Sequence, residues 1–448
     1  MTDKEGLGGL NVPKEETFSE GSDLFHNPAV QKDFIAGSTQ KFYPITGVDS
    51  AGPFEFNITS DGKHYLLLPQ TRLYGTLQVL LANGNKPADG AQVGLVNLFP
   101  SSLFKQIEIE LNGVQVSDAS SSCYGYKSMI ETQLSYGIEA KLTHLTAARY
   151  YDDTEGEAKN ATTSNKGWQK RHNLIKGGKV VDFETLLNCD FFQIYKYLPS
   201  GCNLKVKLVR NDDAFSLFIP PAAADSTLPQ YMIKILDLHI KVRKVFLHPD
   251  LYTENETRFS KASAAILPLV RTQIKTFVIP KDVSSIIESN VIMGQLPRCI
   301  ILCFVSNAAF NGDPTLNSYY FDHFGLNYVS LKVAGERVPD SGLKVKFDQS
   351  LFAEAYRALF DNTGYSHSNS GNGITMESFK NGNTFLAFDL TPDLCNGWHL
   401  HKIKQGTVDI ELSFKTALTE PINLIVYASY DNKLLLDGNR NITYDFPI

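Results

Sequence analysis

One basic cluster with an aromatic residue inside it lies at residues 166–172, with the sequence KGWQKRH. Lys166, Lys170 and Arg171 carry positive charge that phosphates or an acidic protein surface attract, and Trp168 offers a ring on which a base can stack. These four residues are a candidate contact with nucleic acid or with an acidic partner. The competing interpretation, which we favour, is a solvated loop, because charged side chains usually lie in water.

A second candidate is a metal site at His399 and His401, which are two positions apart and would share one face of a strand. Asp393 and Cys395 precede them across an Asn396-Gly397 turn. Neither residue completes a convincing set of ligands at this spacing. We therefore predict no metal and no cofactor.

Two carboxylate pairs, Asp152-Asp153 and Asp212-Asp213, are the residues closest to a glycosidase signature. Adjacent residues on a strand point to opposite faces, and surface turns are rich in Asp without any catalytic role. No motif of a serine hydrolase or of a phosphate-binding loop accompanies them. The sequence predicts a protein that is not an enzyme.

The elements around these residues are mainly strands, and Phe104–Gly137 is the most informative stretch. Ile107, Ile109 and Leu111 alternate with acidic residues, which is the pattern of a half-buried strand. Asn112-Gly113 predicts a type I′ turn of a β-hairpin. Apolar residues at helical spacing follow, from Tyr126 to Leu134, and predict a helix.

A similar succession recurs in the second half of the chain. Residues 329–333 alternate, Ala334-Gly335 turns, and Val338 resumes the strand. A short amphipathic helix follows at residues 352–360. Since the two turns lie about half a chain length apart in 448 residues, the sequence predicts two copies of one module.

The fold class that we predict is all-β, with about eight antiparallel strands and one short helix in each half. Eight strands in two packed sheets make a jelly roll, so the chain is predicted to be a double jelly roll. The apolar positions of 233–245 change parity, which indicates a bulge. The predicted division is an N-terminal arm at 1–40, a first jelly roll at 41–250, a linker at 251–270 and a second jelly roll at 271–448.

The composition excludes several classes of protein. A net charge of −6 and a pI near 6.0 argue against a protein with a broad basic face, so no strong nucleic-acid binding is expected. No apolar run approaches the roughly 20 residues of a membrane span. The scattered cysteines predict free thiols in a reducing compartment.

Blocks of residues spread over most of the chain resemble the major capsid proteins of Polinton/Maverick elements and adintoviruses. The blocks are Leu103–Gly137, Leu208–Phe215, Gly294–Arg298, Asn307–Gly312, Phe321–Phe324, Phe385–Cys395, Lys404–Gly406 and Asp437–Asp445. This resemblance implies a double jelly-roll capsid protein of the lineage that includes the adenovirus hexon. It offers no catalytic residues.

The resemblance also implies partners and a location. Three chains would form a pseudo-hexameric capsomer, capsomers would tile an icosahedral shell, and a single jelly-roll penton protein would occupy the vertices. The protein would be made in the host cytoplasm and reside in the virion capsid. Two alternatives stay open: a carbohydrate-binding β-sandwich, and a copy of the capsid fold that a host genome has kept for another role.

Overall fold

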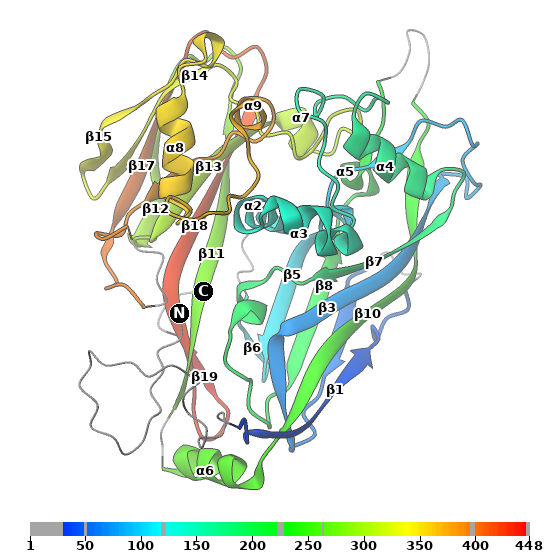
Figure 1. Cartoon of the computed structure of the whole chain (residues 1–448), viewed down its shortest axis with the longest axis vertical. Coiled ribbons are helices and arrows are strands. Elements are labelled where there is room, and N and C mark those ends of the chain that lie inside the picture. Colours follow the sequence, from blue (N-terminus) through cyan, green and yellow to red (C-terminus); the bar gives the residue numbers. More distant parts are fainter. Residues whose placement is uncertain are drawn as a thin grey trace, which may run out of the picture.

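The computed structural model describes residues 30–48, 52–117, 122–221, 228–261, 264–394 and 399–444, and the following account covers these residues. Its strands form two β-sandwiches that stand side by side (Figure 1). The strands of the first sandwich lie between residues 34 and 247, and those of the second between residues 265 and 444. Helix α6 (Pro249–Ser260) connects them.

The first sandwich has two four-stranded antiparallel sheets, β1-β10-β3-β7 and β2-β8-β5-β6. Its eight strands are β1 (Phe34–Phe42), β2 (Phe54–Ile58), β3 (His64–Leu81), β5 (Phe104–Leu111), β6 (Val114–Gln115), β7 (Val180–Leu186), β8 (Leu204–Arg210) and β10 (Tyr231–Leu247). A small additional pair joins β4 (Gly94–Leu95) to β9 (Leu217–Phe218). The predicted bulge is confirmed, since the register of β10 shifts between Ile235 and Asp237.

The second sandwich has the sheets β11-β18-β13-β16 and β12-β17-β14-β15, and β19 extends the first of these beside β18. Its strands are β11 (Ala265–Ile279), β12 (Ser285–Gln295), β13 (Cys299–Ser306), β14 (Leu326–Val333), β15 (Glu336–Lys344), β16 (Leu386–Asp389), β17 (Gln405–Phe414), β18 (Ile422–Leu436) and β19 (Ile442–Tyr444).

The two sandwiches share one strand order. When the eight main strands of either sandwich are counted along the chain, one sheet has the order 1-8-3-6 and the other 2-7-4-5. Two four-stranded sheets that exchange successive strands in this way form a jelly roll. The predicted double jelly roll is therefore confirmed, and so is the duplication.

Both predicted hairpins are present, and the same backbone geometry forms their turns. Asn112 and Gly113 have φ angles of 49° and 80°, and Ala334 and Gly335 have 49° and 94°. Two successive positive φ angles define the type I′ turn, which matches the twist of the paired strands. The predicted helices follow as α2 (Tyr124–Ser135) and α8 (Ala353–Asp361).

The structure contains more helix than the sequence predicted. The further helical segments are α1 (Phe99–Ser102), α3 (Ile138–Leu142), η2 (His144–Ala148), α4 (Lys166–Ile175), η3 (Asp190–Gln193), α5 (Asp213–Ser216), α7 (Asn307–Phe310), η4 (Phe347–Gln349) and α9 (Met376–Lys380). Figure 1 shows α2, α3, α4, α5, α7 and α9 gathered at one end of the molecule, above and between the two sandwiches. The prediction of one short helix in each half was too low.

Two predicted boundaries differ from the structure. Strand β1 begins at Phe34, inside the predicted arm, because it pairs along its length with β10. The first half of the predicted linker is helix α6, and β11 begins at Ala265.

One continuous hydrophobic core extends through both sandwiches. Tyr126 of α2 joins them: its ring stacks on Phe310 of α7 at a centroid distance of 5.4 Å and meets Tyr319 edge-on at 5.7 Å. Such aromatic pairs add to the free energy of apolar burial. The two jelly rolls thus share an apolar contact, which fixes their relative position.

A buried charge cluster reinforces this contact. Lys127 of α2 lies 2.5 Å from Glu131 and 2.9 Å from Asp190, and all three side chains are mostly buried. Each carboxylate also accepts a hydrogen bond from the second sandwich, Glu131 from the Tyr427 hydroxyl and Asp190 from the Thr272 amide. Burial lowers the pKa of Lys127, but the two carboxylates outweigh it and raise that pKa well above its ordinary value.

Candidate functional site

The predicted basic cluster lies on helix α4, not in a loop. Asn165 begins the helix, and its side chain accepts a hydrogen bond from the Trp168 amide. Helix α4 packs against the β4–β9 pair, with the Trp168 ring over Gly94. A Cβ atom on Gly94 would lie 2.4 Å from the indole nitrogen, so the close approach of helix and strand requires glycine.

Trp168 and Arg171 are buried and serve the fold. The Trp168 Nε1 donates to the carbonyl of Phe218 at 2.8 Å. Arg171, which is fully buried, donates to the carbonyls of Leu95 and Tyr151 and pairs with Asp153 at 2.6 Å. The prediction that these two side chains form a contact surface is wrong, because both lie on the face of α4 that packs against the β4–β9 pair.

Lys166 and Lys170 are exposed on the same helix. The Lys170 ammonium lies 5.7 Å from the centre of the Tyr151 ring. A contact between these two lysines and nucleic acid or an acidic partner stays a prediction. Because Trp168 is buried, the ring on which the predicted base stacking depends is not available at this surface.

The carboxylate pairs also have structural partners. Asp152 accepts a hydrogen bond from the Tyr150 hydroxyl, while Asp153 neutralises Arg171. Asp213 pairs with Arg210 at 2.8 Å and accepts the amide of Ile233. Because these carboxylates are engaged within the fold, neither pair offers two free groups facing a common substrate position.

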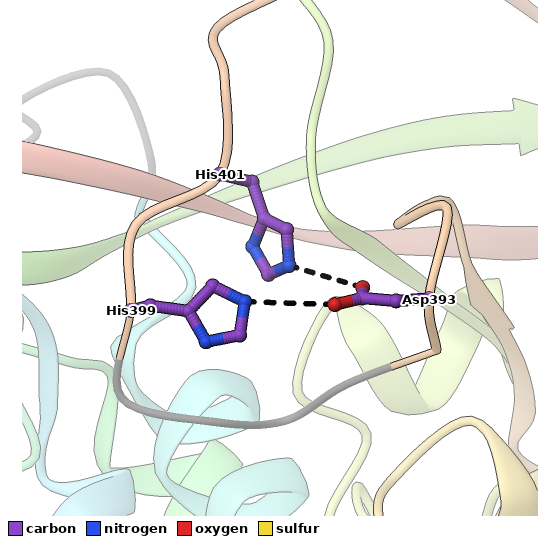
Figure 2. A group of neighbouring side chains, drawn as sticks. All are labelled: Asp393, His399 and His401. Atoms are coloured by element: carbon purple, nitrogen blue, oxygen red, sulfur yellow. Dashed lines mark hydrogen bonds and ion pairs between the residues drawn. The ribbon is translucent and has the colours of Figure 1, made fainter.

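The two histidines are brought together with Asp393, which the sequence analysis named but did not judge to complete a set of ligands. Asp393, His399 and His401 each offer one ligand atom, and these atoms lie within 4.8 Å of one another (Figure 2). All three residues belong to the connection between β16 and β17, so the predicted strand for the histidines is wrong. The predicted neighbour Cys395 lies outside the described residues.

Contacts behind His401 fix the orientation of its ring. Its Nδ1 lies 2.7 Å from a carboxylate oxygen of Asp431 on β18, and its backbone amide donates to the same residue. Arg298 pairs with the other oxygen of Asp431 at 3.0 Å. The hydrogen bond to Asp431 raises the pKa of His401 above its ordinary value.

The edges of the sheets expose much apolar surface. In β1, seven consecutive residues, 35–41, are exposed although the strand is paired along one side. Strands β11 and β12 follow each other in the chain, and each forms the edge of its sheet. We call their exposed apolar side chains the edge patch: Ile266, Val270, Val278, Ile287 and Met293.

The edge patch is unusual for a surface that faces water. Met293 and Ile287 are 70% and 61% exposed, and open edge strands with apolar side chains invite pairing with another chain. Strands β11 and β12 are therefore candidates for contact with another chain.

Among the described residues, no helix combines the length and apolar character that crossing a membrane requires. The described cysteines, which are Cys123, Cys189, Cys202, Cys299 and Cys303, are free thiols. Burial raises the pKa of Cys123 to about 11, so this thiol is a poor nucleophile.

Comparisons with known proteins agree on the fold. A chain of the Sputnik virophage cryo-EM structure superposes with a TM-score of 0.68 at 11% identity, covering 98% of this chain and 94% of that one. The mavirus major capsid protein gives 0.57 at 13% identity, covering 100% and 97%. The Faustovirus major capsid protein gives 0.56 at 11% identity, covering 92% of each chain.

The sequence comparisons are sparser. No family model matches the chain. The uncharacterized protein F54H12.2 of Caenorhabditis elegans is 26% identical over 405 residues, which cover 88% of this chain and 93% of that protein. The chain is thus a double jelly-roll protein, and its fold is that of viral major capsid proteins.

Proposed function

We propose that this chain is a major capsid protein, and that three copies form a capsomer of an icosahedral shell. The observation that carries the proposal is the repeated jelly-roll order in two sandwiches of one chain. Such a chain presents two similar units side by side, so a trimer presents six. A near-hexagonal trimer can then occupy positions that have six neighbours. The similarity to viral capsid proteins over nearly the whole chain supports this role.

We propose that the source of the chain is a Polinton-like virus or transposon, because its sequence blocks resemble those of Polinton/Maverick and adintovirus major capsid proteins. The Phe321–Phe324 block supplies buried Phe321, which packs on Phe385 from the next block at 4.8 Å. The C-terminal block supplies Arg440, which pairs with Glu256 of α6 and so ties the second sandwich to the connecting helix. These residues of the blocks thus stabilise the fold, as expected for a protein with a structural function.

The size of the particle tests the proposal directly. Mass photometry of the purified full chain should show trimers, and electron micrographs should show particles with three-fold symmetry and a hexagonal outline. A strictly monomeric protein across micromolar concentrations would overturn the capsomer. A penton-type partner would be expected to bind preformed trimers at shell vertices.

The edge patch supplies the variant that tests the contact. Replacing both Ile287 and Met293 with Asp places two charges on the proposed interface, so trimers should dissociate while the circular dichroism spectrum of the chain stays that of the folded protein. Val180→Asp is the matched control, since Val180 is 55% exposed on β7, at the far edge of the first sandwich. Trimers that survive the double substitution would exclude the edge patch as the contact.

A second candidate is a capsid-like protein that an animal genome has kept. The similarity to a nematode protein over 93% of its length favours this source. A kept protein with another binding role need not form shells. Concentrating the purified protein under varied salt should therefore yield closed shells for a functional capsid protein, and trimers or smaller species alone for the second candidate.

A carbohydrate-binding role has less support. The carboxylates of Asp152, Asp153 and Asp213 are engaged in the fold, and Trp168 is buried. Glycan-array binding without any assembly would favour that role over the capsid role.

A further inference from the structure

We propose that Asp393, His399 and His401 bind a transition-metal ion, with Zn²⁺ as the best-matched candidate, and that the ion holds the β16–β17 connection on strand β18. The proposed site is independent of the capsid role. It rests on ligand types, on distances and on a supporting carboxylate behind one of the ligands.

The distances between the ligand atoms suit a small ion. The His401 Nε2 lies 3.3 Å from one oxygen of Asp393, and the His399 Nε2 lies 3.6 Å from the other (Figure 2). Two ligand atoms that bind a tetrahedral Zn²⁺ at about 2.0–2.1 Å are about 3.3 Å apart. Small rotations of the exposed His399 and Asp393 side chains therefore bring all three atoms into coordination range.

The support behind His401 is the second observation. The carboxylate of Asp431 is mostly buried and accepts the Nδ1–H of His401, so the lone pair of Nε2 points toward Asp393. Arg298 holds Asp431 in turn. A carboxylate behind a histidine ligand fixes the ring and increases its basicity, an arrangement common in zinc proteins.

The ligand types select the class of ion. Two imidazoles and one carboxylate suit Zn²⁺, Co²⁺, Ni²⁺ or Cu²⁺, whereas Mg²⁺ and Ca²⁺ prefer sites made of oxygen alone. The side chains of His399 and Asp393 are about half exposed, at 53% and 50%, so solvent reaches the site. Water can supply the fourth ligand.

An alternative account of the same geometry needs no ion. A protonated His401 between Asp393 and Asp431 would form two ion pairs and would hold the same loop. The two accounts differ at His399. Its ring lies 3.6 Å from Asp393 and contributes little to an exposed ion pair, but it supplies one of only three protein ligands to a metal.

Isothermal titration of the full chain, with its affinity tag removed and after treatment with EDTA, tests the site with Zn²⁺ alone. We expect one Zn²⁺ per chain, and at least tenfold weaker binding for His399→Ala and for Asp393→Asn. Asp431→Asn should weaken binding by 10- to 100-fold through the orientation of His401. His367→Ala, at an exposed histidine outside the cluster, should bind as the unchanged protein does.

Two further readouts separate metal binding from effects on folding. Co²⁺ should give the strong visible absorption of a tetrahedral complex, and His399→Ala should lose it. Zn²⁺ should raise the Tm of the unchanged protein but not that of His399→Ala. Equal Zn²⁺ binding by the unchanged protein and by His399→Ala, or no binding by either, would overturn the proposal.

Discussion

The buried cluster of Lys127, Glu131 and Asp190 should dominate the stability of the contact between the two jelly rolls. Lys127 neutralises both carboxylates and also donates to the Asn188 carbonyl at 3.0 Å. Lys127→Met keeps most of the length of the side chain but removes its charge. Two carboxylates would then face each other without a cation in a mostly buried position, which is strongly destabilising.

The size of the effect follows from the least costly way to remove the repulsion between the two carboxylates, which is protonation of Glu131. Burial already raises the pKa of this group above its ordinary value of 4.5. Relative to an unfolded chain with that ordinary value, holding one proton at pH 7 costs about 3.4 kcal/mol, at 1.36 kcal/mol for each pH unit. At pH 5 the same step costs about 0.7 kcal/mol. Removal of one partner from a buried ion pair typically costs about 3–5 kcal/mol.

The sign of the pH dependence follows from proton binding. In Lys127→Met, the folded state keeps a proton that the unfolded state releases above the ordinary pKa of the glutamate. The folded state therefore binds more protons between pH 4.5 and 7, and its stability falls as the pH rises through this window. The substitution should be far more harmful at pH 7 than at pH 5.

Urea unfolding followed by circular dichroism, at both pH values and one protein concentration, measures this difference. Lys105→Met is the control, because Lys105 is exposed on β5, and it should change the free energy of unfolding by less than about 0.5 kcal/mol. A Lys127→Met penalty below about 1 kcal/mol at pH 7, or an equal penalty at both pH values, would refute the reasoning.

Three further substitutions test other parts of the fold. Arg171→Met leaves Asp153 buried without its cation and should lower the free energy of unfolding in urea by about 3–5 kcal/mol. Gly94→Val forces a side chain against the Trp168 ring and should lower the Tm and shift the tryptophan emission to the red. Burial alone would raise the pKa of Asp61, but hydrogen bonds from neighbouring amides outweigh it, and the net effect is a lowered pKa. The protein should therefore lose stability as the pH falls below 4. Asp61→Asn should lose less stability than the unchanged protein over the same acid titration. An equal acid response of the two proteins would contradict the assigned role of Asp61.

The strands and hairpins could be predicted because local rules determine them. Alternating side chains and the Asn112-Gly113 turn specify a hairpin within a dozen residues, and distant contacts need not be known. Helix α6 was missed although local signals were present. Pro249 at its first turn, Asp250 beside it and Arg258 in the last turn all favour a helix there.

The contacts of α4 could not be predicted in the same way. Its basic sequence is typical of a solvated loop, yet Arg171 is fully buried because Asp153, 18 positions earlier, lies opposite it. Only the three-dimensional fold brings the charges of Arg171 and Asp153 together. Trp168 depends in turn on Gly94, from a strand of only two residues that no periodicity reveals.

The arrangement around His399 and His401 could not be predicted for a related reason. The spacing of His399 and His401 was visible, but Asp431 comes from β18, 30 residues beyond His401, and its role depends on the antiparallel return of that strand. Asp393 was considered, but it was not judged to complete a convincing set of ligands at this spacing. A loop allows ligands from both of its ends to converge, whereas a strand would have carried them apart.

The two jelly rolls repeat one strand order, but the contacts between them do not repeat. The charged cluster on α2 of the first sandwich has no counterpart on α8, whose buried side chains Ala355 and Leu359 pack within the second sandwich. Because the strand order repeats and the contacts do not, the two jelly rolls are similar in shape but differ in their surroundings. In the proposed capsomer, six sandwiches would therefore alternate around the axis in two kinds, and the symmetry would be three-fold although the outline is hexagonal.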